Sequence, residues 1–282
     1  MDERFRFFSK HTDILNPHLL ALGLRMAGKG IEAGIPFSVT ELFDSLNIRL
    51  STKGNISVLD QNPPNGILFV GDHQQKYEYF PLLALCGQHK RNDIYFMGLP
   101  PFFSNATTFA FLIDPLHTGH VLPVLHRHFG YDPNDWYSRL RSTVSTKLFE
   151  DGSFLDRQRK NMNENSLKTA GLLLNKKHVV SIFPTGDPNK PMDARWQNGV
   201  GTIVNFVDST TQNVYVIPYK IEPGMVHVFK RAQKQYMSGI PPDPQGITIQ
   251  VGAPVSINDI RQKTAGQTTE AIQKYYLQEL SL

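Results

Sequence analysis

Residues 67–83 read ILFVGDHQQKYEYFPLL, which is the junction of two apolar segments across a polar turn. The first segment, GILFVG, is apolar and bounded by glycines, which is typical of a buried strand. The second segment, YFPLLALCGQ, has the length and composition of a buried helix. The turn places His73 directly after the strand and Glu78 directly before the helix. We therefore predict a strand–loop–helix unit whose loop carries a histidine and a carboxylate.

Short apolar segments and longer helical patterns alternate along the rest of the chain. Strands are predicted at GILFVG, DIYFMG, HVVSIFP, NVYVIPYKI, MVHVFK and GITIQVG. Helices are predicted at YFPLLALCGQ, residues 119–129, WYSRLRSTVSTKLFE, ENSLKTAGLLLNKK and NGVGTIVNFVD. Such alternation indicates an α/β sheet with helices on both faces. Ligands of these sheets bind at the carboxyl ends of the strands, where the pattern places His73.

Three regions are expected along the chain. Residues 1–50 read mostly helical, with segments near 3–10, near 16–29 and at 39–47, the last opened by the capping box SVTE. Residues 51–66, STKGNISVLDQNPPNG, are polar and rich in turn residues, which indicates a linker. Residues 67–282 would then form the α/β domain.

Composition narrows the class of protein. Apolar residues make up 40% of the 282 positions and charged residues 19%, which is ordinary for a globular protein. The net charge of +4 suits an anionic substrate or a lipid surface, and it is too small to indicate nucleic acid. The single cysteine, Cys86, excludes an internal disulfide and fits a reducing compartment. Its place in an apolar helical pattern favours a core position over a nucleophile.

The first residues give no sign of a signal peptide or a membrane span. MDERFRFFSKHTD lacks the apolar region of a signal peptide, and the apolar stretch ILNPHLLALGLRMAG is short and interrupted. We expect a cytoplasmic protein in which this stretch packs as a helix on the domain. The alternative, an amphipathic helix lying on the inner face of a membrane, stays open.

The His73 and Glu78 pair can carry base catalysis. A histidine at a strand end serves as a general base when a carboxylate fixes its tautomer and stabilises the imidazolium. Glu78 lies where it could do so, with a substrate hydroxyl in the place of a catalytic serine. The alternative is a surface histidine and a glutamate favoured by the positive end of the helix dipole.

Two further segments suit a phosphate group. In KHVVSIFPTGDPNKPMDARWQNGVG a buried strand ends in a turn rich in backbone N–H groups, and basic residues follow before a helix. The candidate residues are Phe183, Pro184, Thr185, Gly186, Lys190 and Arg195. In DGSFLDRQRK the apolar Phe154 and Leu155 run into Arg157, whose guanidinium at a strand end would bind phosphate bidentately. A loop without a site and a solvated basic turn are the respective alternatives.

Four blocks occur in one order along residues 65–225: HQQKYE, GSFLDR, IFPTG followed by WQNGVG, and VIP at 216–218. This order resembles the glycerolipid acyltransferase family, the enzymes that acylate glycerol 3-phosphate or lysophosphatidate. The resemblance implies a mixed, mostly parallel sheet flanked by helices, with a small helical N-terminal region. It implies an acyl thioester donor, acyl-CoA or acyl-carrier protein, and a phosphorylated or lipid hydroxyl acceptor. It implies no cofactor and no metal.

The same resemblance assigns roles to individual residues. His73 looks like the general base and Glu78 like its carboxylate partner. Arg157 resembles the arginine that holds the phosphate of the acceptor, and the block of Phe183, Pro184 and Gly186 would line the same site. Pro218 matches the fourth block, which the family links to the acyl donor.

The chain departs from the family pattern at several positions. Asp72 stands in place of asparagine and Glu78 in place of aspartate. Thr185 replaces a glutamate, and Asp187 with Pro188 replaces a threonine–arginine pair. The last change removes a phosphate-binding arginine and brings in a carboxylate, so that Lys190 and Arg195 become the candidates to bind the phosphate instead.

Two other functions stay open from the residues. The chain could be an acyltransferase-like protein that binds lipid or anions without activity, which Thr185 and Asp187 favour. It could also be a metal-dependent hydrolase, because Asp114 lies near four histidines, at positions 117, 120, 126 and 128. Their spacing matches no HExxH motif, and the chain has no G-x-S-x-G, P-loop or G-x-G-x-x-G motif.

Overall fold

The computed structural model describes residues 17–33, 35–72, 78–98, 121–123, 152–186 and 190–280. Its strands are β1 (Ile48–Lys53), β2 (Gly66–Gly71), β3 (Ile94–Gly98), β4 (Val121–Pro123), β5 (Val179–Ile182), β6 (Val214–Glu222), β7 (Gln245–Val251) and β8 (Val255–Ser256). Its helices are α2 (Pro17–Ala33), α3 (Ile35–Ser45), α4 (Tyr79–Gln88), α7 (Gly152–Asn175), α8 (Gly199–Phe206), α9 (Met225–Met237), α10 (Ile257–Ile260) and α11 (Ala265–Glu279). A 3-10 turn, η2, covers Ser57–Leu59.

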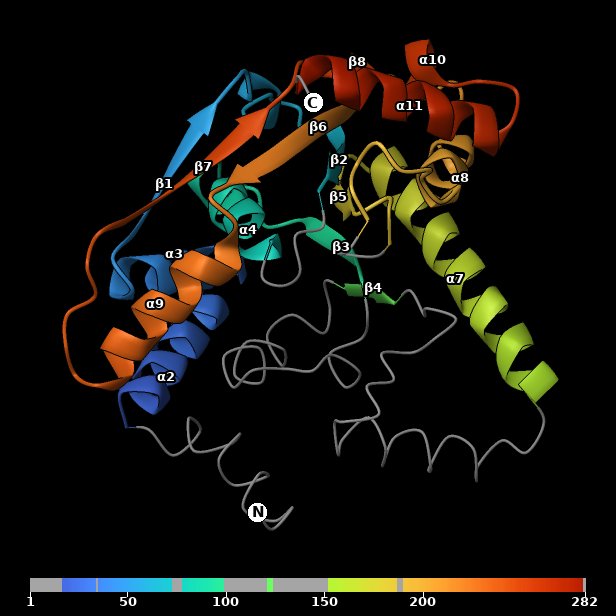
Figure 1. The fold of residues 1–282 in the computed structure, drawn as a ribbon. Coiled ribbons are helices and arrows are strands. Elements are labelled where there is room, and N and C mark those ends of the chain that lie inside the picture. Colours follow the sequence, from blue (N-terminus) through green and yellow to red (C-terminus); the bar gives the residue numbers. More distant parts are fainter. Residues whose placement is uncertain are drawn as a thin grey trace.

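The described strands form one sheet in the order β1-β7-β6-β2-β5-β3-β4, and β8 also pairs with β6 (Figure 1). The pairings of β1 with β7, and of β6, β2, β5, β3 and β4 in succession, are parallel. Strand β6 pairs antiparallel with β7 and β8. The predicted mixed, mostly parallel sheet flanked by helices is therefore confirmed.

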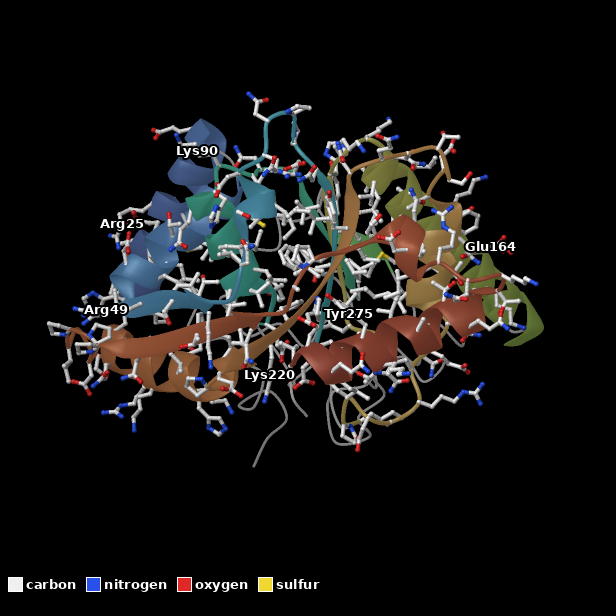
Figure 2. All side chains as sticks on the ribbon, turned by 90° about the horizontal axis from the view of Figure 1, so that it is seen from above. Arg25, Arg49, Lys90, Glu164, Lys220 and Tyr275 are labelled. Carbon is white, nitrogen blue, oxygen red and sulfur yellow. The ribbon has the colours of Figure 1, made fainter. Side chains whose placement is uncertain are left out.

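Helices cover both faces of the sheet. One buried apolar cluster joins the sheet to α2, α3, α4 and α9, and a second joins its other face to α7, α8, α10 and α11. Seen from above, the exposed side chains of Arg25 on α2 and Glu164 on α7 stand on opposite sides of the molecule (Figure 2). Because both faces are covered, the central strand β2 is buried at every position, as its unbroken apolar pattern indicated.

One predicted strand and one predicted helix of the alternating pattern differ in type from their prediction. MVHVFK was predicted as a strand, but it begins α9, because Met225, Val228, Phe229 and Ala232 recur at helical spacing and all four are buried. A window of six residues is too short to distinguish this spacing from alternation. The predicted helix at 119–129 is wrong at residues 121–123, which form β4 beside β3.

The N-terminal third also differs in detail. Helix α3 begins at Ile35, so Ser38 of the predicted capping box lies inside the helix. Residues 48–53 form β1, an edge strand of the same sheet, where the sequence indicated the end of a helical region and a linker. The predicted helices near 3–10 and at WYSRLRSTVSTKLFE lie outside the described residues. Among the helices that are described, none is long and apolar enough to cross a membrane.

Candidate active site

The carboxyl end of β2 lies between two neighbouring strands that run in the same direction. In register, Val70 of β2 is beside Ile182 of β5 on one side and beside Pro218 of β6 on the other. Asp72 and Phe183 therefore leave the sheet at the same edge. Ligands of parallel sheets bind at such an edge, so this is the candidate site.

Glu78 is buried at this edge. It occupies the N-cap position of α4, its side chain makes no capping hydrogen bond to that helix, and it is only 2% exposed. A carboxylate before the first turn of a helix interacts favourably with the helix dipole whether it is buried or exposed, so both interpretations of Glu78 stay predictions. His73 lies outside the described residues, and its predicted role is untested.

Arg157 belongs to α7 and does not follow a strand. Helix α7 starts at Gly152, so Phe154 and Leu155 lie in its first turns, and the strand predicted there is wrong. A pair of apolar residues followed by charges fits a helix as well as a strand end. The proposed contact of the guanidinium with phosphate stays a prediction.

The third block forms a tight turn directly after β5. The Gly186 N–H donates to the Phe183 carbonyl at 3.1 Å, and Gly186 has φ of 63°, a left-handed conformation that glycine adopts without strain. Thr185 is buried, with 1% of its surface exposed, and Phe183 packs against the apolar cluster under α4. The Gln197 N–H donates to the Pro184 carbonyl at 3.0 Å, which holds the two ends of the loop together.

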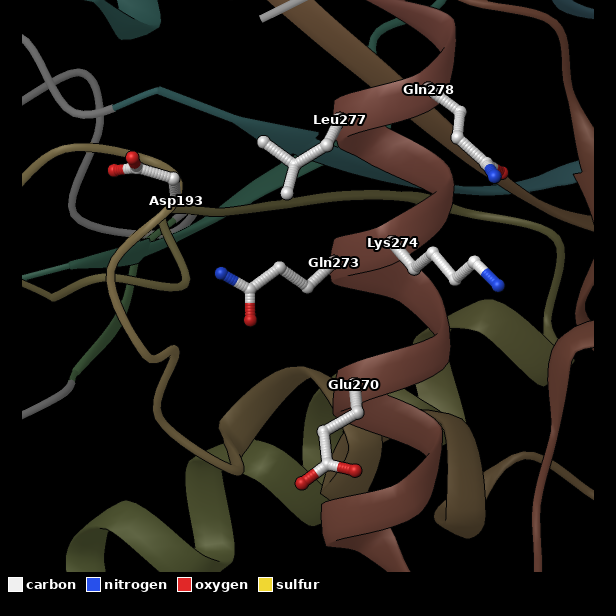
Figure 3. Close-up of a pocket in the computed structure, with 6 residues that line it drawn as sticks. All are labelled: Asp193, Glu270, Gln273, Lys274, Leu277 and Gln278. Carbon is white, nitrogen blue, oxygen red and sulfur yellow. The ribbon is translucent and has the colours of Figure 1, made fainter.

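Lys190 and Arg195 are exposed on the loop that leads from this turn to α8. The buried Trp196 holds this loop in place, because its indole N–H donates to the Met192 carbonyl at 2.8 Å. Gln273 of α11 donates to the carbonyls of Met192 at 3.0 Å and Ala194 at 2.7 Å. Its side chain points from α11 toward this loop, across an open hollow that none of the predicted site residues lines (Figure 3). Both basic side chains thus extend from a well-supported backbone.

The second glycine of WQNGVG, Gly201, allows close helix packing. A Cβ at Gly201 would stand 2.0 Å from the Ala265 carbonyl oxygen, so only glycine lets α8 approach α11 this closely. The Gly201 N–H donates to the Thr269 hydroxyl at 3.2 Å, which satisfies one of the free N–H groups at the start of α8.

Two buried polar residues near the site were missed by the sequence analysis. Tyr219 of β6 and Ser181 of β5 are both 0% exposed, and their hydroxyls share a hydrogen bond of 3.4 Å in which either can donate. Burial raises the pKa of the Tyr219 phenol well above its usual value; the bond to Ser181 opposes this, and the charges of Glu78 and Asp72 add to it. The available signal was a polar residue inside each of the apolar strand segments VVSIF and VIPYKI.

Cys86 lies in the core of the layer formed by α4. It is 0% exposed, and burial raises the pKa of its thiol to about 12, so that it carries no thiolate at neutral pH. Within the described ranges, no three His, Cys, Asp or Glu residues gather to hold a metal ion. The four histidines of the metal hypothesis lie outside those ranges, so that hypothesis is untested.

The fold and the site together define an α/β protein with a buried carboxylate at the carboxyl edge of its sheet. A scan against models of protein families found no match, and a search of curated proteins found none either. Among solved structures, the chain is similar to the crystal structure of the 1-acyl-sn-glycerophosphate (LPA) acyltransferase PlsC from Thermotoga maritima. The two share 12% identity at a TM-score of 0.41, over 95% of this chain and 97% of that one.

Proposed function

We propose that the chain is an O-acyltransferase, which moves a fatty acyl group from a thioester to a hydroxyl of a phosphorylated or lipid acceptor. The observation that carries the proposal is the burial of Glu78, which is 2% exposed and follows β2 at the carboxyl edge of the sheet. A buried carboxylate is costly, and ionisable groups in such places are enriched at functional sites. The four sequence blocks assign this same residue as the partner of the base His73.

In the proposed reaction His73 takes the proton of the acceptor hydroxyl while its oxygen attacks the thioester carbonyl. The carboxylate of Glu78 orients the ring and stabilises the imidazolium. The new C–O bond forms, the C–S bond breaks, and the imidazolium returns the proton to the leaving thiolate. Base catalysis of this kind contributes roughly 10²–10⁴-fold, and positioning of the acceptor contributes much of the rest.

The acceptor phosphate has three candidate ligands in this proposal: Arg157, Lys190 and Arg195. Lys190 and Arg195 are exposed on a loop that Trp196 and Gln273 hold in place. A guanidinium and an ammonium on such a loop suit a phosphate dianion. The acceptor is glycerol 3-phosphate, lysophosphatidate or a related alcohol, and the donor is acyl-CoA or acyl-carrier protein. Peripheral contact with a membrane would follow from lipid products.

A second candidate is a protein that binds a lipid or an anion without transferring an acyl group. Thr185 favours it, because a neutral side chain, 1% exposed, takes the place of the family's acid in the turn after β5. The buried Glu78 favours the enzyme, since a binding protein has no need of a partner for a base.

Acyl transfer decides between the two. Labelled acyl-CoA and acyl-carrier protein would be offered with glycerol 3-phosphate, lysophosphatidate and a phosphate-free alcohol, to wild type and to His73→Ala. We expect transfer by wild type and its loss in the variant. Folded wild type that transfers nothing to any acceptor, while still binding lysophosphatidate, would support the binding protein and overturn the enzyme.

A further inference from the structure

Gln273 is a half-buried polar residue of α11 that holds the loop before α8. Its side-chain amide donates to the carbonyl of Met192 at 3.0 Å and to the carbonyl of Ala194 at 2.7 Å. Figure 3 shows the amide nitrogen turned from the helix toward this loop. An amide group has two N–H donors, so it can satisfy both carbonyls at once. One side chain therefore fixes the directions of two peptide groups of the loop.

The second of these carbonyls belongs to the peptide group that leads into Arg195. On the other side of Arg195 is Trp196, which is only 3% exposed and whose indole N–H donates to the Met192 carbonyl at 2.8 Å. The indole also packs edge-on against Tyr276, one turn after Gln273 on α11, with ring centroids 5.5 Å apart. The backbone of Arg195 is therefore held on both sides, while its side chain is exposed.

Arg195 lies close to the candidate site and is available to an anion. Two residues further along the chain, the Gln197 N–H donates to the Pro184 carbonyl at 3.0 Å, in the turn after β5. Two residues span at most about 7 Å, so Arg195 starts near this turn. Among the residues that the structure describes, none forms an ion pair or a hydrogen bond with the guanidinium. Asp193 lines the hollow beside Gln273, which Arg195 does not line (Figure 3).

We propose that Gln273 is a positioning residue that orients Arg195 toward the phosphate of the acceptor. This inference rests on the proposed function, in which Arg195 is one of the candidate phosphate ligands. A guanidinium binds phosphate through two parallel N–H groups, so its affinity depends on direction as well as charge. An arginine on a loose loop loses conformational freedom when phosphate binds. The hydrogen bonds of Gln273 remove part of that loss before binding.

The same contacts distinguish Arg195 from Lys190. The hydrogen bonds of Gln273 and Trp196 reach residues 192 and 194, and Lys190 lies before the turn in which the Ala194 N–H donates to the Pro191 carbonyl. An ammonium also binds phosphate as a point charge, which gains less from a fixed direction. Gln273 should therefore act through the arginine.

The test replaces the amide of Gln273 with a side chain of similar length that cannot donate. Gln273→Met keeps the volume and removes both hydrogen bonds. Gln278→Met is the matched control, because Gln278 is exposed on the same helix, lines the same hollow and donates to no carbonyl in the described part of the chain (Figure 3). Arg195→Gln and the double variant Gln273→Met/Arg195→Gln complete the set.

For each variant we would measure kcat and KM with two phosphorylated acceptors, glycerol 3-phosphate and lysophosphatidate, and with a phosphate-free alcohol. Calorimetry would give the Kd of the phosphorylated acceptors without the donor. The midpoint of urea unfolding would report any loss of stability.

We expect Gln273→Met to raise KM and Kd for the phosphorylated acceptors about 5–10-fold with kcat nearly unchanged, because the guanidinium is no longer oriented before binding. KM for the phosphate-free alcohol should stay the same. The double variant should be no worse than Arg195→Gln alone, since Gln273 acts only through Arg195. Gln278→Met should leave all these values unchanged. A role in packing alone would lower the unfolding midpoint without distinguishing the acceptors.

The outcomes separate this inference from the function on which it rests. If wild type transfers acyl groups, but Gln273→Met affects all acceptors equally or none, or its loss multiplies with that of Arg195→Gln, the positioning role is overturned. If wild type transfers nothing but binds a phosphorylated acceptor, and Gln273→Met weakens that binding, the proposed function fails and the pair of Gln273 and Arg195 stands as part of an anion site. Wild type that neither acylates nor binds these acceptors would overturn both.

Discussion

Tyr219 and Gly71 face one another across β6 and β2, and the phenol fills the space in which a side chain at position 71 would lie. The glycine at the end of the central strand is therefore a requirement of packing. Because Gly71 has no side chain, the Tyr219 hydroxyl can cross β2 and reach the hydroxyl of Ser181 on β5. The packing at the end of β2 thus depends on a residue that has no side chain.

Gly71→Ala should destabilise the fold by about 1–3 kcal/mol, because the new methyl group must displace a fully buried ring. Urea unfolding followed by circular dichroism measures the change. Gly246→Ala is the matched control, since a Cβ at that strand position meets nothing within 4 Å and should cost less than about 0.5 kcal/mol. Equal stability of the two variants would contradict the placement of the Tyr219 ring.

Arg91 ties together the starts of three parallel strands. It pairs with Asp93, just before β3, through two hydrogen bonds of 2.8 Å. It also donates to the carbonyls of Asn65 at 3.1 Å, before β2, and Lys177 at 2.8 Å, before β5. Arg91→Met should cost about 2–4 kcal/mol, somewhat below the loss for a fully buried pair because Asp93 is partly exposed. Lys90→Met, at the exposed neighbouring position, is the control and should cost almost nothing.

The ion pair of Arg91 and Asp93 should make the free energy of unfolding depend on pH. Burial opposes ionisation of Asp93, but the hydrogen bonds and charge of Arg91 outweigh it and lower the pKa of the carboxyl. A pKa that is lower in the folded state adds stability above the unfolded value, near 3.8, and this stability is lost as pH falls through the folded value. The difference in unfolding free energy between wild type and Asp93→Asn should therefore be large at about pH 7 and shrink below about pH 4. A difference independent of pH would contradict the ion pair.

Cys86 should be unreactive in the folded protein. Its thiol is fully buried with a pKa of about 12, and it is the only cysteine in the chain, so a thiol reagent reports on this residue alone. We expect almost no reaction with a disulfide reagent at about pH 8 until guanidinium chloride unfolds the protein, and then one equivalent. Rapid labelling of native protein with loss of transfer activity would instead indicate a nucleophile.

Lys190 and Arg195 should matter only for acceptors that carry a phosphate. Replacing both with glutamine removes two positive charges from the exposed loop, and it should raise KM for glycerol 3-phosphate about tenfold or more. KM for a phosphate-free alcohol should stay unchanged. Arg157→Gln is expected to act in the same way, with the exposed Lys168→Gln on the same helix as its control. An equal effect on both acceptors would show that these residues do not bind the phosphate.

Much of the fold was predictable because buried parallel strands and amphipathic helices leave strong local patterns. The segment GILFVG predicted β2 to within its boundaries, and the turn after it predicted the edge at which Glu78 lies. Helix α9 was mistaken for a strand because MVHVFK, taken alone, is a short apolar segment that ends at a charged residue, and the helical spacing appears only over a longer stretch. Strand β1 was missed because its residues, IRLSTK, are polar at an edge, and only pairing with β7 makes them a strand.

The site was predictable only in part, for a physical reason. The place of Glu78 directly before α4 could be predicted because it follows a recognisable strand and turn, and its role stays a prediction. Tyr219 and Ser181 could not, because their contact joins β6 and β5 across β2, and no local pattern reports which strands will be neighbours. Gly71 leaves room for this contact because it has no side chain. That requirement becomes visible only when β6 is placed beside β2 in the sheet.

The most direct test of the account is the transfer rate of His73→Ala, Glu78→Gln and the double variant, each checked for native unfolding behaviour. If Glu78 acts only through His73, its replacement has no further effect once His73 is gone. The double variant should therefore be no slower than His73→Ala alone, with kcat reduced roughly 10²–10⁴-fold. If the two single losses multiply, or if Glu78→Gln transfers acyl groups at the rate of wild type, the buried carboxylate is not the partner of the base and the account is contradicted.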